Sequence, residues 1–336
     1  MNSLKFSCYS IAISLFLLGS TQELFAQDEV ITYVKKNGGF TADKDSAAYT
    51  RIISNAVDST GFHVLTEYYA NGNLKRQGHV QSTSPRRMLA EGWVETYYEN
   101  GNLNTRIRYA NTRRIDTAYF YFSNGVLNEK RFYLNSASST INQKDAVNMQ
   151  QIYYADSTGR VMVEDGKGCA EIALNKVDKE KGAFVNGYRH GQWFGTFLKG
   201  KYQFEEWYDK GKLTWGVSRD STGKEYSYTK VRIQPQYPGG ISNFMQIVGQ
   251  SFTYSKEAID NKVEGRLRLK FVIDATGNPT EFELIQDVGY GTYESAIEAV
   301  HAAGPWTPGN SRGVPVKVKY TLPLLLHFNA ASNSEP

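Results

Sequence analysis

Cysteine is nearly absent from this sequence, and histidine is scarce. Only two cysteines, Cys8 and Cys169, occur in 336 residues, so a disulfide framework and a cysteine-rich zinc site are both excluded. The spacing of the five histidines fits no metal site either. The five are His63, His79, His190, His301 and His327. We therefore expect no metal and no cofactor.

Long apolar runs and runs of one charge are also lacking. The main apolar stretch, Ile11–Leu18, is far shorter than the ~20 residues that a membrane-spanning helix needs. The net charge is only +4, and no long basic run occurs, so we do not expect a nucleic-acid partner. With 40% hydrophobic and 21% charged residues, the composition is that of a globular protein.

The first residues have the pattern of an export signal. Lys5 supplies a positive charge ahead of the apolar Ile11–Leu18, and Leu24-Phe25-Ala26 before Gln27 is an acceptable cleavage site. We therefore predict a signal peptide over residues 1–26 and a mature chain in the periplasm or cell envelope. An inner-membrane anchor that is not cleaved is the alternative.

What the sequence does contain is tyrosine and glycine, with 23 and 30 residues, and this favours β structure with many turns. One pattern recurs between residues 62 and 228: an aromatic strand, a turn with glycine, and a strand opened by Leu or Val. Asn-Gly suits the positive φ angles of a tight hairpin turn. The copies are Glu67–Leu74, Glu95–Leu103, Tyr119–Leu127 and Glu206–Leu213. The predicted turn residues are Gly72, Gly101, Gly125 and Gly211.

These copies, together with Gly187–Trp193, resemble MORN-type repeats, including the variant of YwqK-like antitoxins. The resemblance implies that each unit is one β-hairpin and that hairpins stack into an elongated antiparallel sheet. Several must stack, because one hairpin cannot bury a core alone. We predict such an array over residues 62–230, after a lead-in segment over 27–61, with Ser136–Asn148 as the best candidate for an insertion.

Residues 231–328 follow a different pattern, in which helical and strand periods alternate. The expected elements are a helix from Ile241, a short helix over Lys256–Asn261, strands over Arg266–Ile273 and Thr280–Gln286, a helix capped by Thr292, and a strand over Val314–Leu326. The order helix, strand, strand, helix, strand predicts an α+β domain, followed by a tail over 329–336. The whole chain is thus expected to be mainly β with an α+β C-terminal domain.

A series of motif residues runs through this domain in a fixed order. It consists of Tyr237, Pro238, Gly239, Gly240, Gly265, Trp306, Pro308, Pro315 and Pro323. The series resembles the C-terminal domain of the TonB energy-transducer family, in the form common among Bacteroidetes-type bacteria. The resemblance implies a non-enzymatic module that binds an extended peptide of an outer-membrane transporter, or of another envelope protein, by β-strand addition. It implies a role in TonB-dependent transmembrane transport.

The resemblance also implies where the peptide binds, because the last strand of the family's sheet presents the free edge. That edge is expected at Val316, Lys317, Val318, Lys319, Tyr320, Thr321 and Leu322. Lys317 and Lys319 alternate along it, as is typical of an edge that must avoid self-aggregation. A second copy of the chain is an alternative partner for such an edge.

Three patterns that are typical of enzymes occur by chance. Gly309–Gly313 fits Gly-x-Ser-x-Gly, but that elbow requires a strand before the serine and a helix after it. Gly195–Lys201 is followed by Tyr202, where a phosphate loop needs Ser or Thr. Asp-Ser-Thr-Gly occurs from Asp58, from Asp156 and from Asp220, which indicates recurring turns. We therefore predict no enzymatic activity.

The residues alone also allow a second function. The protein could be a structural or adaptor protein whose repeat surface binds the partner, with the TonB-like domain as a passive module. The aromatic residues of the repeats are expected mainly to pack the sheet; an exposed aromatic binding surface is the alternative.

Overall fold

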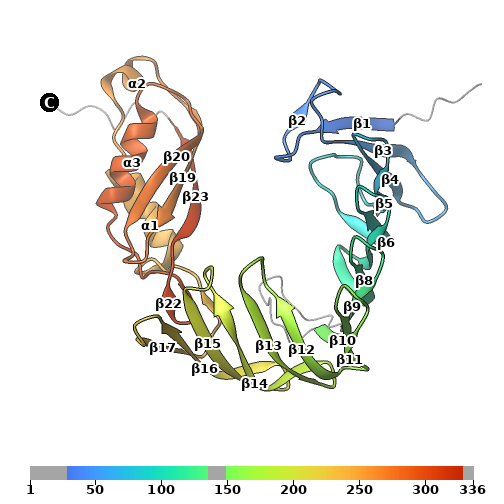
Figure 1. Ribbon diagram of the computed structural model, residues 1–336. Coiled ribbons are helices and arrows are strands. Elements are labelled where there is room, and N and C mark those ends of the chain that lie inside the picture. Colours follow the sequence, from blue (N-terminus) through green and yellow to red (C-terminus); the bar gives the residue numbers. More distant parts are fainter. Residues whose placement is uncertain (1–28, 135–148, 328–336) are drawn as a thin grey trace, which may run out of the picture. The chain divides into compact units, whose positions relative to one another are not determined.

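The computed structural model describes residues 29–134 and 149–327 (Figure 1). The predicted signal peptide, the candidate insertion Ser136–Asn148 and the tail over 329–336 lie outside the described residues. The chain divides into two compact units. The first contains residues up to Gly101 together with Tyr109–Thr112, and the second contains Asn102–Arg108 and the residues from Arg113 onward. The described residues are mostly β, as the composition predicts.

The first unit is an antiparallel sheet that also includes the lead-in segment. Its strands are β1 (Glu29–Val34), β2 (Phe40–Thr41), β3 (Tyr49–Val57), β4 (His63–Tyr69), β5 (Leu74–Val80) and β6 (Ala90–Tyr97). β1 pairs with both β2 and β3, and β3 to β6 pair in chain order. Ile53, Leu65 and Val80 form its small buried core.

A second antiparallel array makes up the first part of the second unit (Figure 1). Its strands are β8 (Arg113–Tyr121), β9 (Leu127–Tyr133), β10 (Met149–Ala155), β11 (Val161–Glu164), β12 (Lys167–Ala173), β13 (Lys179–Val185), β14 (Tyr188–Phe197), β15 (Tyr202–Asp209), β16 (Lys212–Asp220) and β17 (Glu225–Tyr228), while residues of β7 (Leu103–Ala110) fall in both units. From β8 on, each strand pairs with the next. We call β12–β17 the hairpin array.

The hairpin array packs around Trp193, which is fully buried. The rings of Phe184 and Tyr208 meet the Trp193 ring edge to face, at centroid distances of 5.1 and 6.3 Å. The indole lies directly over Gly182, where a Cβ atom would approach it to 2.2 Å. Position 182 therefore needs glycine, and these aromatic residues pack the sheet as predicted. Cys169 of β12, in contrast, is exposed.

The predicted turn glycines all adopt a positive φ angle, but the turns are of two kinds. At Gly72, Gly101 and Gly125 the φ angles are 85°, 88° and 87°, and each N–H donates to the carbonyl three residues earlier. The preceding residues lack a positive φ, so these are type I turns closed by a left-handed glycine and not the expected two-residue turns. Among these four predicted turns, only the one at Lys210-Gly211, with φ of 46° and 82°, is a two-residue hairpin turn.

The Asp-Ser-Thr-Gly segments are turns, as the sequence indicates. In each, a carboxylate oxygen of the aspartate accepts the backbone N–H and the hydroxyl of the threonine two residues later. These hydrogen bonds, with the threonine hydroxyl first, lower the pKa of Asp58 to about 2 and also lower the pKa of Asp156 and Asp220. The aspartates therefore cap turns and are not a catalytic set.

The C-terminal part of the second unit is an α+β domain (Figure 1). Its elements are β18 (Arg232–Ile233), α1 (Gly240–Ser251), α2 (Lys256–Asp260), β19 (Gly265–Ile273), β20 (Pro279–Gln286), α3 (Thr292–Ala302), β21 (Asn310–Ser311), β22 (Val314–Pro315) and β23 (Val318–Leu326). The main sheet has the order β20-β19-β23, and β18, β21 and β22 form a small second sheet. Side chains from α1, α3 and the main sheet share one core.

Two details of this domain differ from the sequence prediction. Thr292 does not cap α3: Gly291, at φ 74°, precedes the helix, and Thr292 is a buried first residue whose hydroxyl donates to Asp287 or Gly289. The last strand is also broken. The Val316 N–H donates to the Gly309 carbonyl at 2.9 Å, which ends β22 and delays β23 until Val318.

Candidate functional site

Strand β23 is an edge strand. Its nine residues pair with β19 in an uninterrupted antiparallel register, from Ile273 opposite Val318 to Gly265 opposite Leu326. No other strand of the described residues pairs with β23. Its outer row of backbone N–H and C=O groups is therefore available for another strand.

Pro323 indicates which residues direct their backbone groups outward. Proline has no N–H, so within a strand it is tolerated where that position faces away from the partner. Residues of an antiparallel pair alternate between bonding each other and facing away. Since Pro323 lies opposite Arg268, we infer that Lys319, Thr321 and Leu325 share its outward direction. The residues between them bond to β19.

The predicted binding edge and strand β23 overlap only in part, because β23 begins at Val318 and continues to Leu326. Val316 and Lys317 lie before β23; the Val316 N–H is already bonded, and Lys317 pairs with Glu281. Val318, Lys319, Tyr320, Thr321 and Leu322 lie on β23, which continues to Leu326. The last four residues of β23 belong to the predicted strand but not to the predicted binding edge.

The two faces of β23 differ in chemistry. Tyr320, Leu322, Leu324 and Leu326 pack in the core or against it on the helix side. On the open side, Lys319, Thr321, Pro323 and Leu325 are exposed. This alternation places an exposed row of mixed polarity and a buried, mainly apolar row along the same edge.

The open side of the main sheet is rich in positive charge. We use the name basic face for Arg266, Arg268 and Lys270 of β19 with Lys319 of β23. Lys270 forms an ion pair with Glu283 of β20 at 2.5 Å, and the charge of Lys319 contributes to the lowered pKa of Glu283. Arg266 and Arg268 are exposed and form no ion pair with any residue of the described ranges. The positive charge is therefore least balanced at these two arginines.

A groove of about 670 Å³ lies at the end of β23. Most of its lining is apolar or uncharged. The lining residues are Val248, Gly249, Gln250, Phe252, Thr253, Tyr254, Leu324, Leu325, Leu326 and His327. The Tyr254 hydroxyl donates to the His327 carbonyl at 3.2 Å and ties the loop after α1 to the end of the strand. We call this cavity the edge groove.

The motif residues of the predicted family build the core that supports this edge. Tyr237 and Trp306 pack edge to face at 5.3 Å, and both contact Phe244. Gly239 and Gly240, at φ 78° and 84°, carry the chain from Pro238 into α1. At Gly265 a Cβ atom would meet Val288 at 2.8 Å. Pro308 lies between Trp306 and the small sheet, and Pro315 ends β22 opposite Asn310.

Arg312 is a buried charged residue that the sequence did not indicate. It occupies the turn between β21 and β22 with Gly313, at φ 51° and 78°, and it is buried. Its Nε donates to Glu206 at 2.9 Å, another guanidinium nitrogen donates to Glu180 at 3.3 Å, and its guanidinium lies 3.8 Å from the centre of the Phe204 ring. The turn of the small sheet thus inserts into the hairpin array.

The carboxylates around Arg312 have further partners. Arg189 donates to Glu180 at 3.2 Å, and the hydroxyls of Tyr208 and Tyr228 donate to Glu206, each at 2.9 Å. Burial, followed by the negative charge of Glu206, raises the pKa of Tyr228 far above its usual range. The buried Arg312 and the half-buried Arg189 therefore balance two buried carboxylates, which is the condition for such a network to be stable.

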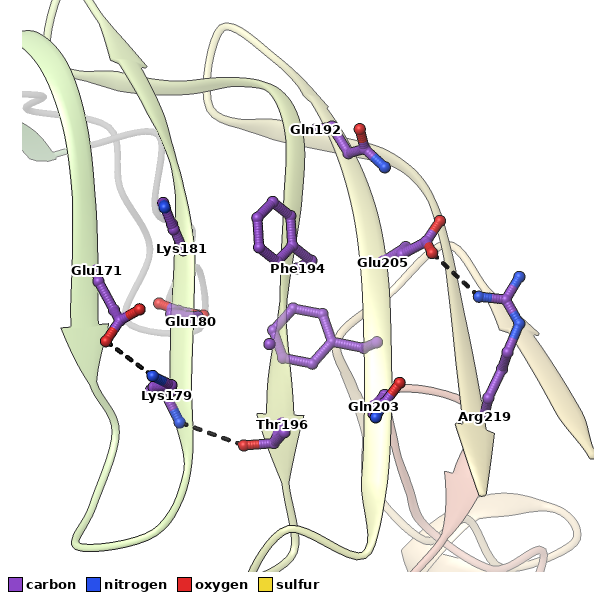
Figure 2. Close-up of a pocket in the computed structure, with 12 residues that line it drawn as sticks. Glu171, Lys179, Glu180, Lys181, Gln192, Phe194, Thr196, Gln203, Glu205 and Arg219 are labelled. Atoms are coloured by element: carbon purple, nitrogen blue, oxygen red, sulfur yellow. Dashed lines mark hydrogen bonds and ion pairs between the residues drawn. The ribbon is translucent and has the colours of Figure 1, made fainter. Parts of the chain in front are cut away.

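A second cavity, of about 410 Å³, lies on the hairpin array, and Figure 2 shows it. The Phe194 side chain, 47% exposed, projects into this region. Ion pairs flank it, from Lys179 to Glu171 at 3.0 Å and from Arg219 to Glu205 at 3.1 Å. We call it the array groove. The sequence analysis named an exposed aromatic binding surface as the alternative to packing, and Phe194 is an exposed aromatic residue of this kind.

Neither a metal site nor a membrane-spanning helix is found in residues 29–134 and 149–327. No group of three or more His, Cys, Asp or Glu side chains there could hold a metal ion. No helix in these ranges is both long and apolar enough to cross a bilayer.

The comparison with known families identifies the domain that carries the edge. Residues 250–327 match the family model for the Gram-negative bacterial TonB protein C-terminal. The match includes all three strands of the main sheet and ends one residue after β23. The TonB C-terminal domain is an interaction domain of envelope energy transducers without enzymatic activity, in agreement with the sequence prediction. The match does not reach the hairpin array, so the MORN resemblance stays a prediction. No curated protein matches this chain.

Proposed function

We propose that this protein is an exported TonB-like module that binds an extended peptide of an outer-membrane partner by adding it to β23, as part of TonB-dependent transport. One observation carries the proposal: β23 has a regular ladder on one side and no strand on the other among the described residues. An edge of this kind binds a peptide mainly through main-chain hydrogen bonds. The match of residues 250–327 to the TonB C-terminal family supports the same partner class.

Hydrogen exchange on the full chain tests this proposal. Peptides derived from outer-membrane transporters are added, and amide protection is compared with that of the free protein. We expect new protection at Lys319, Thr321 and Leu325, because their N–H groups acquire carbonyl partners. Protection confined to β12–β16 would contradict the proposal.

The array groove supports a second function, that of an adaptor which binds its partner through the hairpin array. The observation that favours it is the exposed ring of Phe194 beside paired charges. Phe194→Ser removes the apolar surface, and Trp93→Ser in β6, at another exposed aromatic side chain outside this groove, is the control. If the adaptor function holds, Phe194→Ser alone abolishes capture of the envelope partner. If strand addition holds, both variants bind peptide like wild type.

A further inference from the structure

We propose that the peptide which pairs with β23 alternates acidic and apolar side chains. This inference rests on the proposed strand addition and names the chemistry of the partner. Side chains of a strand point to opposite faces in turn. An added strand therefore presents every second residue to the basic face and the residues between them to the helix side, where the edge groove lies.

The charge on the open side selects the acidic residues. Arg268 lies opposite Pro323 and Arg266 lies opposite Leu325, so the β23 side chains between these arginines and an added strand are uncharged. A strand beside β23 would run about 10 Å from β19, since neighbouring strands are ~4.8 Å apart. A long arginine side chain covers most of that distance and can reach an acidic side chain of the added strand, and Lys319 lies on β23 itself, next to that strand.

The two glutamates of the main sheet that form ion pairs do so with lysines and not with the two arginines. Glu281 and Glu283 lie on β20, the strand on the opposite side of β19, where they pair with Lys317 and Lys270. Arg266 and Arg268 remain without an ion pair in the described part of the chain. A basic peptide would bring like charges together, which disfavours it strongly.

The helix side selects the apolar residues. The edge groove is lined by Val248, Phe252, Leu324 and Leu326, among others, and a peptide side chain that enters it leaves water. Leu324 and Leu326 of β23 line the groove beside the edge, so an apolar side chain is favoured there over a polar one. The two sides of one edge therefore require opposite chemistry from neighbouring residues of the peptide.

Titration of the full chain with short synthetic peptides tests this pattern. The first peptide alternates Asp and Val, and three others replace Asp by Asn, replace Asp by Lys, or replace Val by Ser. A fifth has the composition of the first but places all Asp residues in one half. We expect the Asp-Val alternation to bind about tenfold more tightly than the Asn-Val peptide, with the other peptides weaker still.

Variants assign the charge preference to the basic face. Arg266→Gln combined with Arg268→Gln should reduce the preference for Asp over Asn several-fold, measured as the ratio of the dissociation constants of the two peptides. The matched control, Lys210→Gln with Lys212→Gln, removes the same charge from two exposed lysines, one in the turn after β15 and one at the start of β16, and should preserve the preference.

Each result has a distinct meaning. Equal binding of the Asp and Asn peptides, or of the alternating and the half-and-half peptides, overturns the inference while strand addition stands. Binding of no peptide at all overturns both. A dimer in sedimentation that Thr321→Pro dissociates would show that a second copy of the chain occupies the edge, and this also overturns the inference.

Discussion

Arg312 and Glu206 are 106 residues apart in the sequence, yet Nε of the arginine donates to the buried carboxylate of the glutamate at 2.9 Å. The contact joins the turn between β21 and β22 to the hairpin array within the second unit. Removing one partner of a buried ion pair leaves the other charge without compensation, which costs more than the pair itself contributes.

Arg312→Met should therefore lower the free energy of unfolding by about 3–5 kcal/mol. The control Arg232→Met removes an exposed arginine of β18 and should have little effect. Urea denaturation of the full chain measures both. Adding Glu206→Gln to Arg312→Met should recover part of the loss, because the two changes are coupled. Additive losses would show that the two side chains act independently.

The buried Glu67 should make the first unit sensitive to acid. Burial alone would raise the pKa of Glu67, but the hydrogen bond and charge of Lys75 at 2.8 Å and those of Arg51 at 2.7 Å outweigh it, so the pKa is lowered. A lowered pKa in the folded state stabilises the protein above the ordinary glutamate value of about 4.3, and this stability is lost as the pH falls through the folded-state value.

Glu67→Gln should consequently cost about 1.5–3 kcal/mol at neutral pH and progressively less below pH ~4. Glu164→Gln, at an exposed glutamate of β11, is the matched control. Urea midpoints of the three proteins across this pH range measure the effect. A difference between Glu67→Gln and wild type that does not change with pH would contradict the lowered pKa.

Gly101 should tolerate no β-branched side chain. Its φ of 88° is favourable only for glycine, although no heavy atom would lie within 4 Å of a Cβ atom there. Gly101→Val should therefore destabilise the protein by about 1–3 kcal/mol through backbone strain alone. Gly249→Ala is the informative counterpart, because that glycine is helical and equally uncrowded. It should be neutral or stabilising by up to ~1 kcal/mol in the same denaturation assay.

Elements that depend on neighbouring residues could be predicted from the sequence. The spacing of Phe244 and Val248 predicted α1, whose buried residues are these two. Asp220 predicted a turn because its carboxylate bonds Thr222, two residues away. Such signals need only short stretches of chain, and the order of motif residues was sufficient to predict the family match over 250–327.

Contacts between distant residues could not be predicted in this way. Arg312 stands in a segment that looks like a loop, and nothing near it indicates Glu206 or Glu180. The break before β23 depends on a hydrogen bond between Val316 and Gly309 that no residue type announces. For the same reason the sequence predicted one continuous strand from Val314, whereas β23 begins at Val318. The edge groove and the lack of an ion-pair partner at Arg266 and Arg268 among the described residues both depend on how the strands pair, which neighbouring residues in the sequence do not reveal.

Titration of the Thr321→Pro variant with transporter-derived peptides most directly tests whether β23 accepts a peptide strand. The variant removes one outward N–H and leaves the ladder to β19 intact, so it should stay folded by circular dichroism and lose binding. Thr321→Val keeps the N–H and should bind like wild type, whereas Leu322→Pro breaks the inner ladder and should unfold the domain. If Thr321→Pro is folded and binds peptide like wild type, strand addition at β23 is wrong.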